Sequence, residues 1–170
     1  ITNLMKVSKT TGFAEKFPIC LHTATEHSNL APLGLDAPEG VLGTSNYHFY
    51  YPDTPKNKAF AKAFKDAYGR EPKVGALYGY LAAQFITKAL EKAGKMDREQ
   101  FINALEGMKV DSPIGEIEMR AFDHQAMLPM YMGVTKKVPE YPFLIATDIV
   151  TIPGKDVMPS IEEIKKARGQ

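Results

Sequence analysis

The spacing of apolar residues changes twice along the chain and predicts strands, then a block of three helices, then strands again. At the start, Ile1, Leu4 and Met5 recur at helical spacing and predict a helix over residues 1–11. Gly12 suits the left-handed residue that ends such a helix. A helix that begins without a capping residue indicates a trimmed part of something longer.

Two strands are expected after this helix. The nearly continuous apolar run over residues 17–21 is typical of a strand that is covered on both faces. Residues 41–51 predict a second strand, which is rich in aromatic and polar side chains. The order helix, strand, loop, strand belongs to an α/β layer.

The middle of the chain carries three helices with recognisable caps. Thr54 is a good N-cap before a proline, and Asp97 with Gln100 three residues later forms a capping-box pattern. Glycines follow each apolar stripe where the helix should end. The expected helices run from Pro55 to Gly69, from Gly75 to Ala93 and from Asp97 to Gly107.

Strands return after the helices, over residues 114–119, 130–134 and 143–152, and Ser160 is expected to cap a short terminal helix. One explanation of this order is a chain that leaves one lobe near residue 50 and returns to it after about residue 121. The alternative is a single α/β sandwich with a helical insertion, and the pattern leaves both open.

Composition narrows the class of protein. The 170 residues are 44% hydrophobic and 24% charged, which is typical of a globular domain. Lysine and arginine number 21 against 20 acidic residues, without a basic stripe, so we expect no nucleic-acid partner. No apolar stretch is long enough to span a bilayer, so we expect no direct membrane insertion. Cys20 is the only cysteine, and its apolar surroundings predict a buried, inert thiol.

The sequence does not match the common motifs of enzymes or metal sites. The sequence has no Gly-x-Ser-x-Gly elbow and no phosphate-binding glycine loop, so we expect no catalytic residues. His22, Glu26 and His27 lie within six residues, but inverted zinc-protease motifs place two residues, not three, between the first histidine and the glutamate. We therefore expect neither a metal site nor a cofactor.

A series of short motifs carries a family resemblance. The chain resembles the type I periplasmic solute-binding proteins of branched-chain amino-acid-type ABC importers, the extracellular ligand-binding receptor family, in their C-terminal part. The resemblance spans roughly residues 1–137. Its motifs are PEGVLG (38–43), NKAF (57–60), YGREP (68–72), YGYLAAQ (78–84), ALEKAG (89–94), INALEG (102–107), SPIG (112–115) and DHQA (123–126).

The resemblance implies an α/β, two-lobed fold, each lobe a mostly parallel sheet flanked by helices, of which this chain holds only the C-terminal portion. The same resemblance implies that this chain carries two of the fold's three crossing segments and lacks the first half of the protein. The implied parts are 1–50 in the C-terminal lobe, 51–55 crossing, 56–121 in the N-terminal lobe, 122–127 crossing, and 128–170 returning to the C-terminal lobe with the tail.

The resemblance also implies how such a protein works. A solute is held between the lobes, hinge closure excludes water, and the closed form docks on the membrane permease of an ABC importer. The implied location is periplasmic or extracellular. A ligand-sensing domain of a receptor or regulator uses the same fold and is the alternative function, and an α/β enzyme is the third.

Candidate ligand contacts lie where strands end facing the cleft. In amino-acid-binding relatives an acidic residue near position 23 meets the ligand ammonium, whereas here Thr23 stands there and Glu26 follows. The hydroxyl of Thr23 with the imidazole of His22 suits a carboxylate, amide or phenol. Tyr47 lies just before the first crossing segment, where the resemblance implies that an aromatic ring lines the cleft; packing in the core is the alternative. Tyr78 is at the start of the long helix, where relatives often place an aromatic ring against the ligand.

Overall fold

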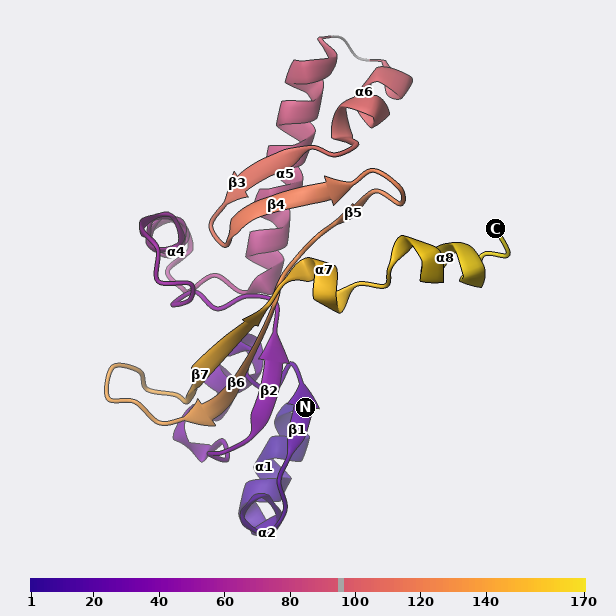
Figure 1. Cartoon of the computed structure of the whole chain (residues 1–170). Coiled ribbons are helices and arrows are strands. Elements are labelled where there is room, and N and C mark those ends of the chain that lie inside the picture. Colours follow the sequence, from indigo (N-terminus) through magenta and orange to yellow (C-terminus); the bar gives the residue numbers. More distant parts are fainter. Residues whose placement is uncertain (95–96) are drawn as a thin grey trace. The chain divides into compact units, whose positions relative to one another are not determined.

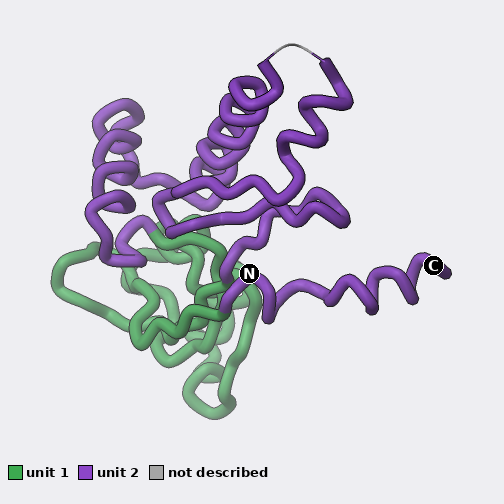
Figure 2. Tube along the Cα trace, turned by 45° about the horizontal axis from the view of Figure 1, so that its top comes forward, with its two compact units in different colours: residues 1–48, 130–152 green, residues 49–129, 153–170 purple. Residues whose placement is uncertain are grey.

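The computed structural model describes residues 1–94 and 97–170, which fall into two compact units (Figure 1, Figure 2). Unit 1 comprises residues 1–48 and 130–152, and unit 2 comprises residues 49–129 and 153–170. The chain therefore passes between the units three times, after residues 48, 129 and 152. Each unit is built from two segments that are distant in the sequence.

Unit 1 is a sheet with helices from its first segment. Its strand order is β1-β2-β6-β7, with β1 parallel to β2 and the other pairs antiparallel. Strand β6, from the second segment, lies between β2 and β7, so the sheet needs both segments. The elements are α1 (Thr2–Thr10), α2 (Phe13–Lys16), β1 (Cys20–His22), α3 (His27–Leu30), the 3-10 helix η1 (Ala31–Asp36), β2 (Leu42–Ser45), β6 (Met130–Lys136) and β7 (Ile145–Ile152).

The core of unit 1 joins α1, η1 and the sheet. Six buried apolar residues form it, and Ile19, Leu21 and Leu33 pack against them half-buried. Because these residues come from five stretches of the chain, their burial holds the helices on the sheet. The six are Met5, Ala24, Leu30, Ala37, Val41 and Leu144.

Unit 2 combines helices with a small antiparallel sheet of order β3-β4-β5. The buried stripe of α5 recurs every four residues, at Leu77, Leu81, Phe85 and Ala89, as expected for one helix face. The elements are α4 (Pro55–Tyr68), α5 (Val74–Ala93), α6 (Arg98–Leu105), β3 (Lys109–Ser112), β4 (Gly115–Arg120), β5 (Gln125–Ala126), α7 (Gly154–Val157) and α8 (Ile161–Ala167).

The predicted helix caps of unit 2 are confirmed. The Thr54 hydroxyl accepts a hydrogen bond from the Asn57 amide at 3.2 Å, and the Asp97 carboxylate accepts one from the Gln100 amide at 2.9 Å. Ser160 forms a complete capping box at the start of α8. Gly69 and Gly94 end α4 and α5 with left-handed φ angles of 66° and 70°.

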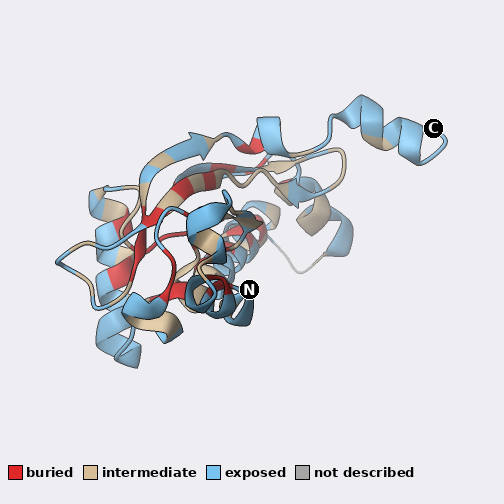
Figure 3. Cartoon of the chain, turned by 90° about the horizontal axis from the view of Figure 1, so that it is seen from below, coloured by how far each residue is buried: buried red, intermediate tan, exposed pale blue. Residues whose placement is uncertain are grey.

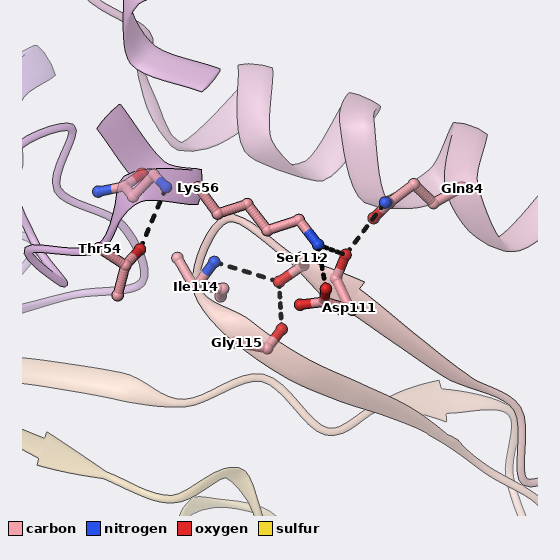
Figure 4. A network of polar contacts seen from close by, with 8 residues as sticks. Thr54, Lys56, Gln84, Asp111, Ser112, Ile114 and Gly115 are labelled. Atoms are coloured by element: carbon pink, nitrogen blue, oxygen red, sulfur yellow. Dashed lines mark hydrogen bonds and ion pairs between the residues drawn. The ribbon is translucent and has the colours of Figure 1, made fainter. Parts of the chain in front are cut away.

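Polar contacts tie the helices of unit 2 to the β3–β4 hairpin (Figure 4). The Lys56 ammonium of α4 pairs with the Asp111 carboxylate and donates to the Asp111 carbonyl at 2.7 Å. Gln84 of α5 donates to the same carbonyl at 3.2 Å. Both ion-pair side chains are exposed, so we expect the pair to add less than about 1 kcal/mol to stability.

The start of the first strand and the exposure of its thiol both differ from what the sequence predicts. Strand β1 begins only at Cys20, and Cys20 is exposed rather than buried. The reason is that only one face of this run is covered, because Ile19 and Leu21 pack against the core of unit 1 and Cys20, between them, points to the opposite face. Phe17 is 55% exposed.

The second expected strand is shorter than expected. The strand predicted over 41–51 ends at Ser45, because the Ser45 hydroxyl donates to the Tyr47 carbonyl at 2.9 Å and accepts from the Tyr47 amide at 3.2 Å. Strand β3 was not predicted from the sequence; it ends at Ser112, whose hydroxyl accepts from the Ile114 amide at 3.2 Å where the chain turns into the β3–β4 hairpin. Short-range side-chain bonds therefore end strands that apolar spacing alone would extend.

The division of the chain also differs from the expected boundaries. Residues 122–127 do not form a crossing, because β5 pairs with β4 inside unit 2, with Met119 opposite Ala126. Residues 128–170 do not stay together either, since 130–152 belong to unit 1 and 153–170 to unit 2.

Contacts within unit 2 explain where the last segment lies. Gly154 packs against the backbone of Met127 and Leu128, and the Arg120 guanidinium donates to the Pro159 carbonyl at 2.9 Å. The Lys165 ammonium lies 5.6 Å from the centre of the Phe122 ring, a cation–π contact. These contacts hold a segment whose helix α8 is exposed except at Ile164 (Figure 3).

Candidate functional site

The carboxyl ends of β1 and β2 bring polar side chains together in unit 1. The two strands are parallel, so their carboxyl ends meet at one edge of the sheet, the place where α/β proteins bind ligands. His22 is the last residue of β1 and lies opposite Thr44 of β2. The His22 Nδ1 atom and the Thr44 hydroxyl oxygen are 2.6 Å apart.

This contact orients the His22 ring. When the Thr44 hydroxyl donates to Nδ1, the ring proton sits on Nε2, which then donates outward. The His22 side chain is exposed, so a solute can reach that nitrogen. An Nε2–H donor held in this way suits an acceptor oxygen of a carboxylate, an amide or a phenol.

Thr23 turns the chain sharply after β1. Its φ angle is +62°, a left-handed conformation that is costly for a β-branched residue. Its carbonyl accepts hydrogen bonds from the Asn29 side-chain amide at 2.7 Å and from the Glu26 backbone amide at 3.1 Å. These bonds hold the strained residue at the candidate site, as is common where a loop serves binding.

Glu26 begins the short helix α3 in unit 1. It is the N-cap residue, but its carboxylate accepts no capping hydrogen bond, and the side chain is half-buried. Its backbone carbonyl accepts from the Asn29 and Leu30 amides at 2.9 and 3.1 Å. The backbone position of Glu26 is therefore fixed while its carboxylate is not used by the helix.

The loop after β1 is pressed against β2. Ala24 and Thr25 are fully buried, and the Thr25 hydroxyl has no hydrogen-bond partner among the residues that the structure describes. A Cβ atom added to Gly43 would lie 2.9 Å from both the Thr25 amide nitrogen and the Ala24 Cβ atom. The missing side chain of Gly43 therefore lets the loop approach the strand.

Replacing Gly43 with alanine is expected to move this loop. The added methyl group overlaps backbone atoms, which should lower the free energy of unfolding of unit 1 by about 1–2 kcal/mol. Hydrogen exchange at the amides of residues 23–26 measures the effect. The Gly40→Ala variant is a poor control because its φ is +78°, so Gly75→Ala in open space on α5 is used instead. Unchanged exchange at 23–26 would contradict the close-approach argument.

Tyr47 and His48 are buried residues of unit 1. His48 is fully buried with its ring centre 6.0 Å from that of Tyr131. Burial, with a smaller effect of the His27 charge, lowers the pKa of His48 from 6.5 to about 4. Tyr47 is only 2% exposed, so the structure supports its alternative interpretation as a packing residue.

Tyr78 belongs to unit 2. It is 40% exposed near the start of α5 and lines a hollow of about 420 Å³. The hollow is mainly apolar, and His124, whose Nε2 atom lies 3.0 Å from a Glu106 carboxylate oxygen, is at its wall. Its other lining residues include Leu81, Phe85, Phe101, Met119 and Leu128.

His22, Thr23 and Glu26 thus lie at the end of β1 and in the loop after it in unit 1, whereas Tyr78 belongs to unit 2. Sequence reasoning missed Thr44, which orients His22. A parallel pairing of 20–22 with 42–44 would have found it, but a single sequence does not give that register.

Comparison with known proteins identifies the family. Residues 1–138 match the family model described as periplasmic binding protein, which is most of the chain. The chain belongs to the periplasmic binding protein family. It is a family of binding proteins rather than of enzymes, as the sequence analysis expected.

One curated relative and two solved structures are similar to this periplasmic binding protein chain over different shares of its length. The leucine-, isoleucine-, valine-, threonine- and alanine-binding protein of Pseudomonas aeruginosa is 36% identical over 92 residues, which are 54% of this chain and 24% of the relative. An amino acid ABC transporter substrate-binding protein from Pseudomonas fluorescens aligns with a TM-score of 0.79 at 22% identity, over 95% of this chain and 43% of that one.

The second structure is a Rhodopseudomonas palustris ABC transporter solute-binding protein in complex with 4-hydroxybenzoate. It aligns with a TM-score of 0.76 at 24% identity, over 89% of this chain and 41% of that one. These likenesses show the α/β periplasmic binding protein fold. The chain spans about two fifths of the length of these solved structures. Among the described residues, no helix is long and apolar enough to cross a membrane.

Proposed function

We propose that the chain forms part of the substrate-binding component of an ABC importer and helps to capture a small organic carboxylate. The observation that carries the proposal is the His22–Thr44 pair at the carboxyl ends of two parallel strands, next to the strained Thr23. Capture needs matching polar atoms and no reactive group, and this edge offers such atoms.

The chemistry of the site favours a carboxylate as the common feature of the ligand. The outward Nε2–H of His22 and the hydroxyl of Thr23 can both donate hydrogen bonds to a carboxylate oxygen, whereas the Thr44 proton is used on His22 Nδ1. Hydrogen bonds to a charged acceptor are the stronger kind. The P. aeruginosa relative is named for binding amino acids, and the R. palustris structure contains 4-hydroxybenzoate. Both ligand types carry a carboxylate. Amino-acid-like solutes and aromatic acids are therefore the proposed class, and Glu26 would meet an ammonium group where one is present.

The proposed mechanism is closure of two lobes on the solute. Unit 1 would contribute His22, Thr23 and Glu26 from the C-terminal lobe, and Tyr78 would contribute from the other lobe. Solute contacts that exist only in the closed state shift the equilibrium toward closure. The closed form would then dock on the membrane permease in the periplasmic or extracellular space.

Titration of the labelled chain with leucine, 4-hydroxybenzoate and glycerol, followed by NMR, tests the proposal. We expect the amides of residues 22–26 and 44 to shift with at least one carboxylate and not with glycerol. Replacing His22 with alanine should weaken that binding about tenfold, because one hydrogen bond to a charged group is lost.

His124→Ala in unit 2 is the matched control, since His124 is also an exposed histidine that contacts one neighbouring side chain. It should leave the affinity unchanged. If neither carboxylate shifts residues 22–26, or if His22→Ala binds as tightly as the parent chain, the proposed site is wrong.

A further inference from the structure

One row of residues runs from the candidate site across the whole sheet of unit 1, whose four strands lie side by side (Figure 1). His22 of β1 lies opposite Thr44 of β2, and Thr44 lies opposite Met132 of β6. Met132 in turn lies opposite Val150 of β7. Side chains that lie opposite each other in a ladder point to the same face of the sheet. The His22–Thr44 pair therefore shares its face with a methionine side chain.

This face becomes apolar beyond Thr44 and remains accessible in unit 1. Tyr131 and Gly133, the neighbours of Met132 in β6, are buried on the opposite face. Met130 is two residues from Met132 and points to the same face, and both methionines are half-buried. Val150, at the end of the row, is 56% exposed. We name the side chains of Met130 and Met132 the methionine surface.

The spacing of the strands sets the size of a molecule that can touch both His22 and the methionine surface. Neighbouring strands are about 4.8 Å apart, so the Met132 backbone lies about 10 Å from that of His22. The His22 Nδ1 atom faces Thr44, and its Nε2–H can donate to a carboxylate oxygen at about 3 Å. A single ring joined to that carboxylate then reaches over Thr44 to the methionine surface.

We propose that the methionine surface selects an aromatic carboxylate, whose carboxylate accepts from His22 and whose ring lies against Met130 and Met132. The inference rests on the proposed function, because it assigns the body of the same solute. A thioether sulfur makes favourable contacts with an aromatic ring at about 5 Å, whereas a saturated group of the same size gains only apolar contact. Benzoates and short arylalkanoates are the class of solute that fits.

An α-amino acid fits this face less well. Its ammonium group needs acceptor oxygens, and removing water from it without them is costly. Neither the row nor the methionine surface includes an acidic residue. The proposed class therefore carries its only charge at the end that meets His22.

Glu26 follows a loop that packs on the other face of the sheet. Gly43 precedes Thr44 in β2, so a Cβ atom added to it would point away from the His22 face. That atom would lie 2.9 Å from both the Ala24 Cβ atom and the Thr25 amide nitrogen. A solute whose ammonium is held by Glu26 is therefore drawn away from the methionine surface.

Labelling the methionine methyl groups with ¹³C tests the proposal by NMR. The labelled chain is titrated with benzoate, cyclohexanecarboxylate and leucine, and the amides of residues 22–26 are followed in the same samples. We expect benzoate to bind about three- to tenfold more tightly than cyclohexanecarboxylate, which has the carboxylate but no aromatic ring. Only benzoate should move the methyl signals of Met130 and Met132 upfield, as the face of an aromatic ring placed over a methyl group does.

A substitution that removes the sulfur and keeps the volume separates the two contributions. Met132→Leu should reduce the preference for benzoate over cyclohexanecarboxylate to less than about twofold, while both acids still bind. Met158→Leu is the matched control, because Met158 is also half-buried but belongs to unit 2, and it should leave the preference unchanged. The methyl shifts of the parent chain decide the matter if Met132→Leu does not fold.

Equal binding of benzoate and cyclohexanecarboxylate would overturn the proposal, and so would tighter binding of leucine or an unchanged preference in Met132→Leu. Methyl signals that stay in place while the amides of residues 22–26 shift would also overturn it, yet they would leave the proposed function intact. If no carboxylate shifts those amides, the proposed function is wrong and the aromatic selection is wrong with it.

Discussion

Between pH 6.5 and pH 4, unit 1 is expected to lose about 3 kcal/mol of its free energy of unfolding through His48 alone. The pKa of His48 is lowered to about 4 in the folded chain, mainly by burial and also by the His27 charge. The unfolded chain therefore takes up a proton below pH 6.5 that the folded chain excludes. The stability contribution is complete above pH 6.5, is lost as the pH falls toward 4, and changes no further below that.

Hydrogen exchange of the β2 and β6 amides as a function of pH measures this loss, because both strands lie in the sheet of unit 1. A His48→Gln variant should be less stable at pH 7.5 but should lose much less stability on acidification. His22→Gln, at an exposed position, should keep the steep dependence of the parent chain. If His48→Gln is as acid-sensitive as the parent, burial of His48 does not control the response.

The Gly154→Ala variant is expected to detach residues 153–170 from the rest of unit 2. A Cβ atom at this position would lie 2.6 Å from both the carbonyl carbon and the carbonyl oxygen of Met127, and 2.9 Å from the Leu128 carbonyl oxygen. These are backbone atoms that no rotamer change can remove. We expect a cost of about 3 kcal/mol, at the upper end of overpacking effects.

Trypsin cleavage after Lys155 and Lys165 should become faster in this variant, while exchange at α5 should not change. Gly79→Ala is the matched control, because a Cβ atom at this exposed position of α5 meets nothing within 4 Å. That substitution should instead stabilise the helix by about 0.5–1 kcal/mol. Equal cleavage of Gly154→Ala and the parent chain would show that α7 and α8 do not depend on this contact.

Local signals predicted the helices of unit 2 well. Thr54, Asp97 and Ser160 cap helices through hydrogen bonds to an amide three residues later, and Gly69 and Gly94 end helices with left-handed φ angles. These interactions involve neighbours in the sequence, so the residue types are enough to find them.

Long-range pairing explains what the sequence did not predict. Cys20 was expected to be buried because its neighbours are apolar, but its burial depends on what packs on its face of β1, and the core of unit 1 packs on the opposite face, against Ile19 and Leu21. The place of residues 153–170 likewise depends on contacts of Gly154 and Arg120 with residues more than 25 positions away. Composition does not encode such partners.

The candidate site was partly predictable. His22, Thr23 and Glu26 follow an apolar run, and a loop after a strand is where α/β proteins place polar ligand contacts. Tyr47 was named for its aromatic ring, yet the same ring fills the core of unit 1, because apolar contact area serves packing and binding equally. Thr44 needed the register of β1 on β2.

The position of β6 has a consequence for synthesis of the chain. Strand β6 is made about 85 residues after β2, and it must insert between β2 and β7 before the sheet of unit 1 exists. A nascent chain that has emerged only as far as α6 holds β1 and β2 without their antiparallel neighbour. The ribosome must therefore deliver nearly the whole sequence before unit 1 can fold, while α4 and α5 are able to form helical turns much earlier.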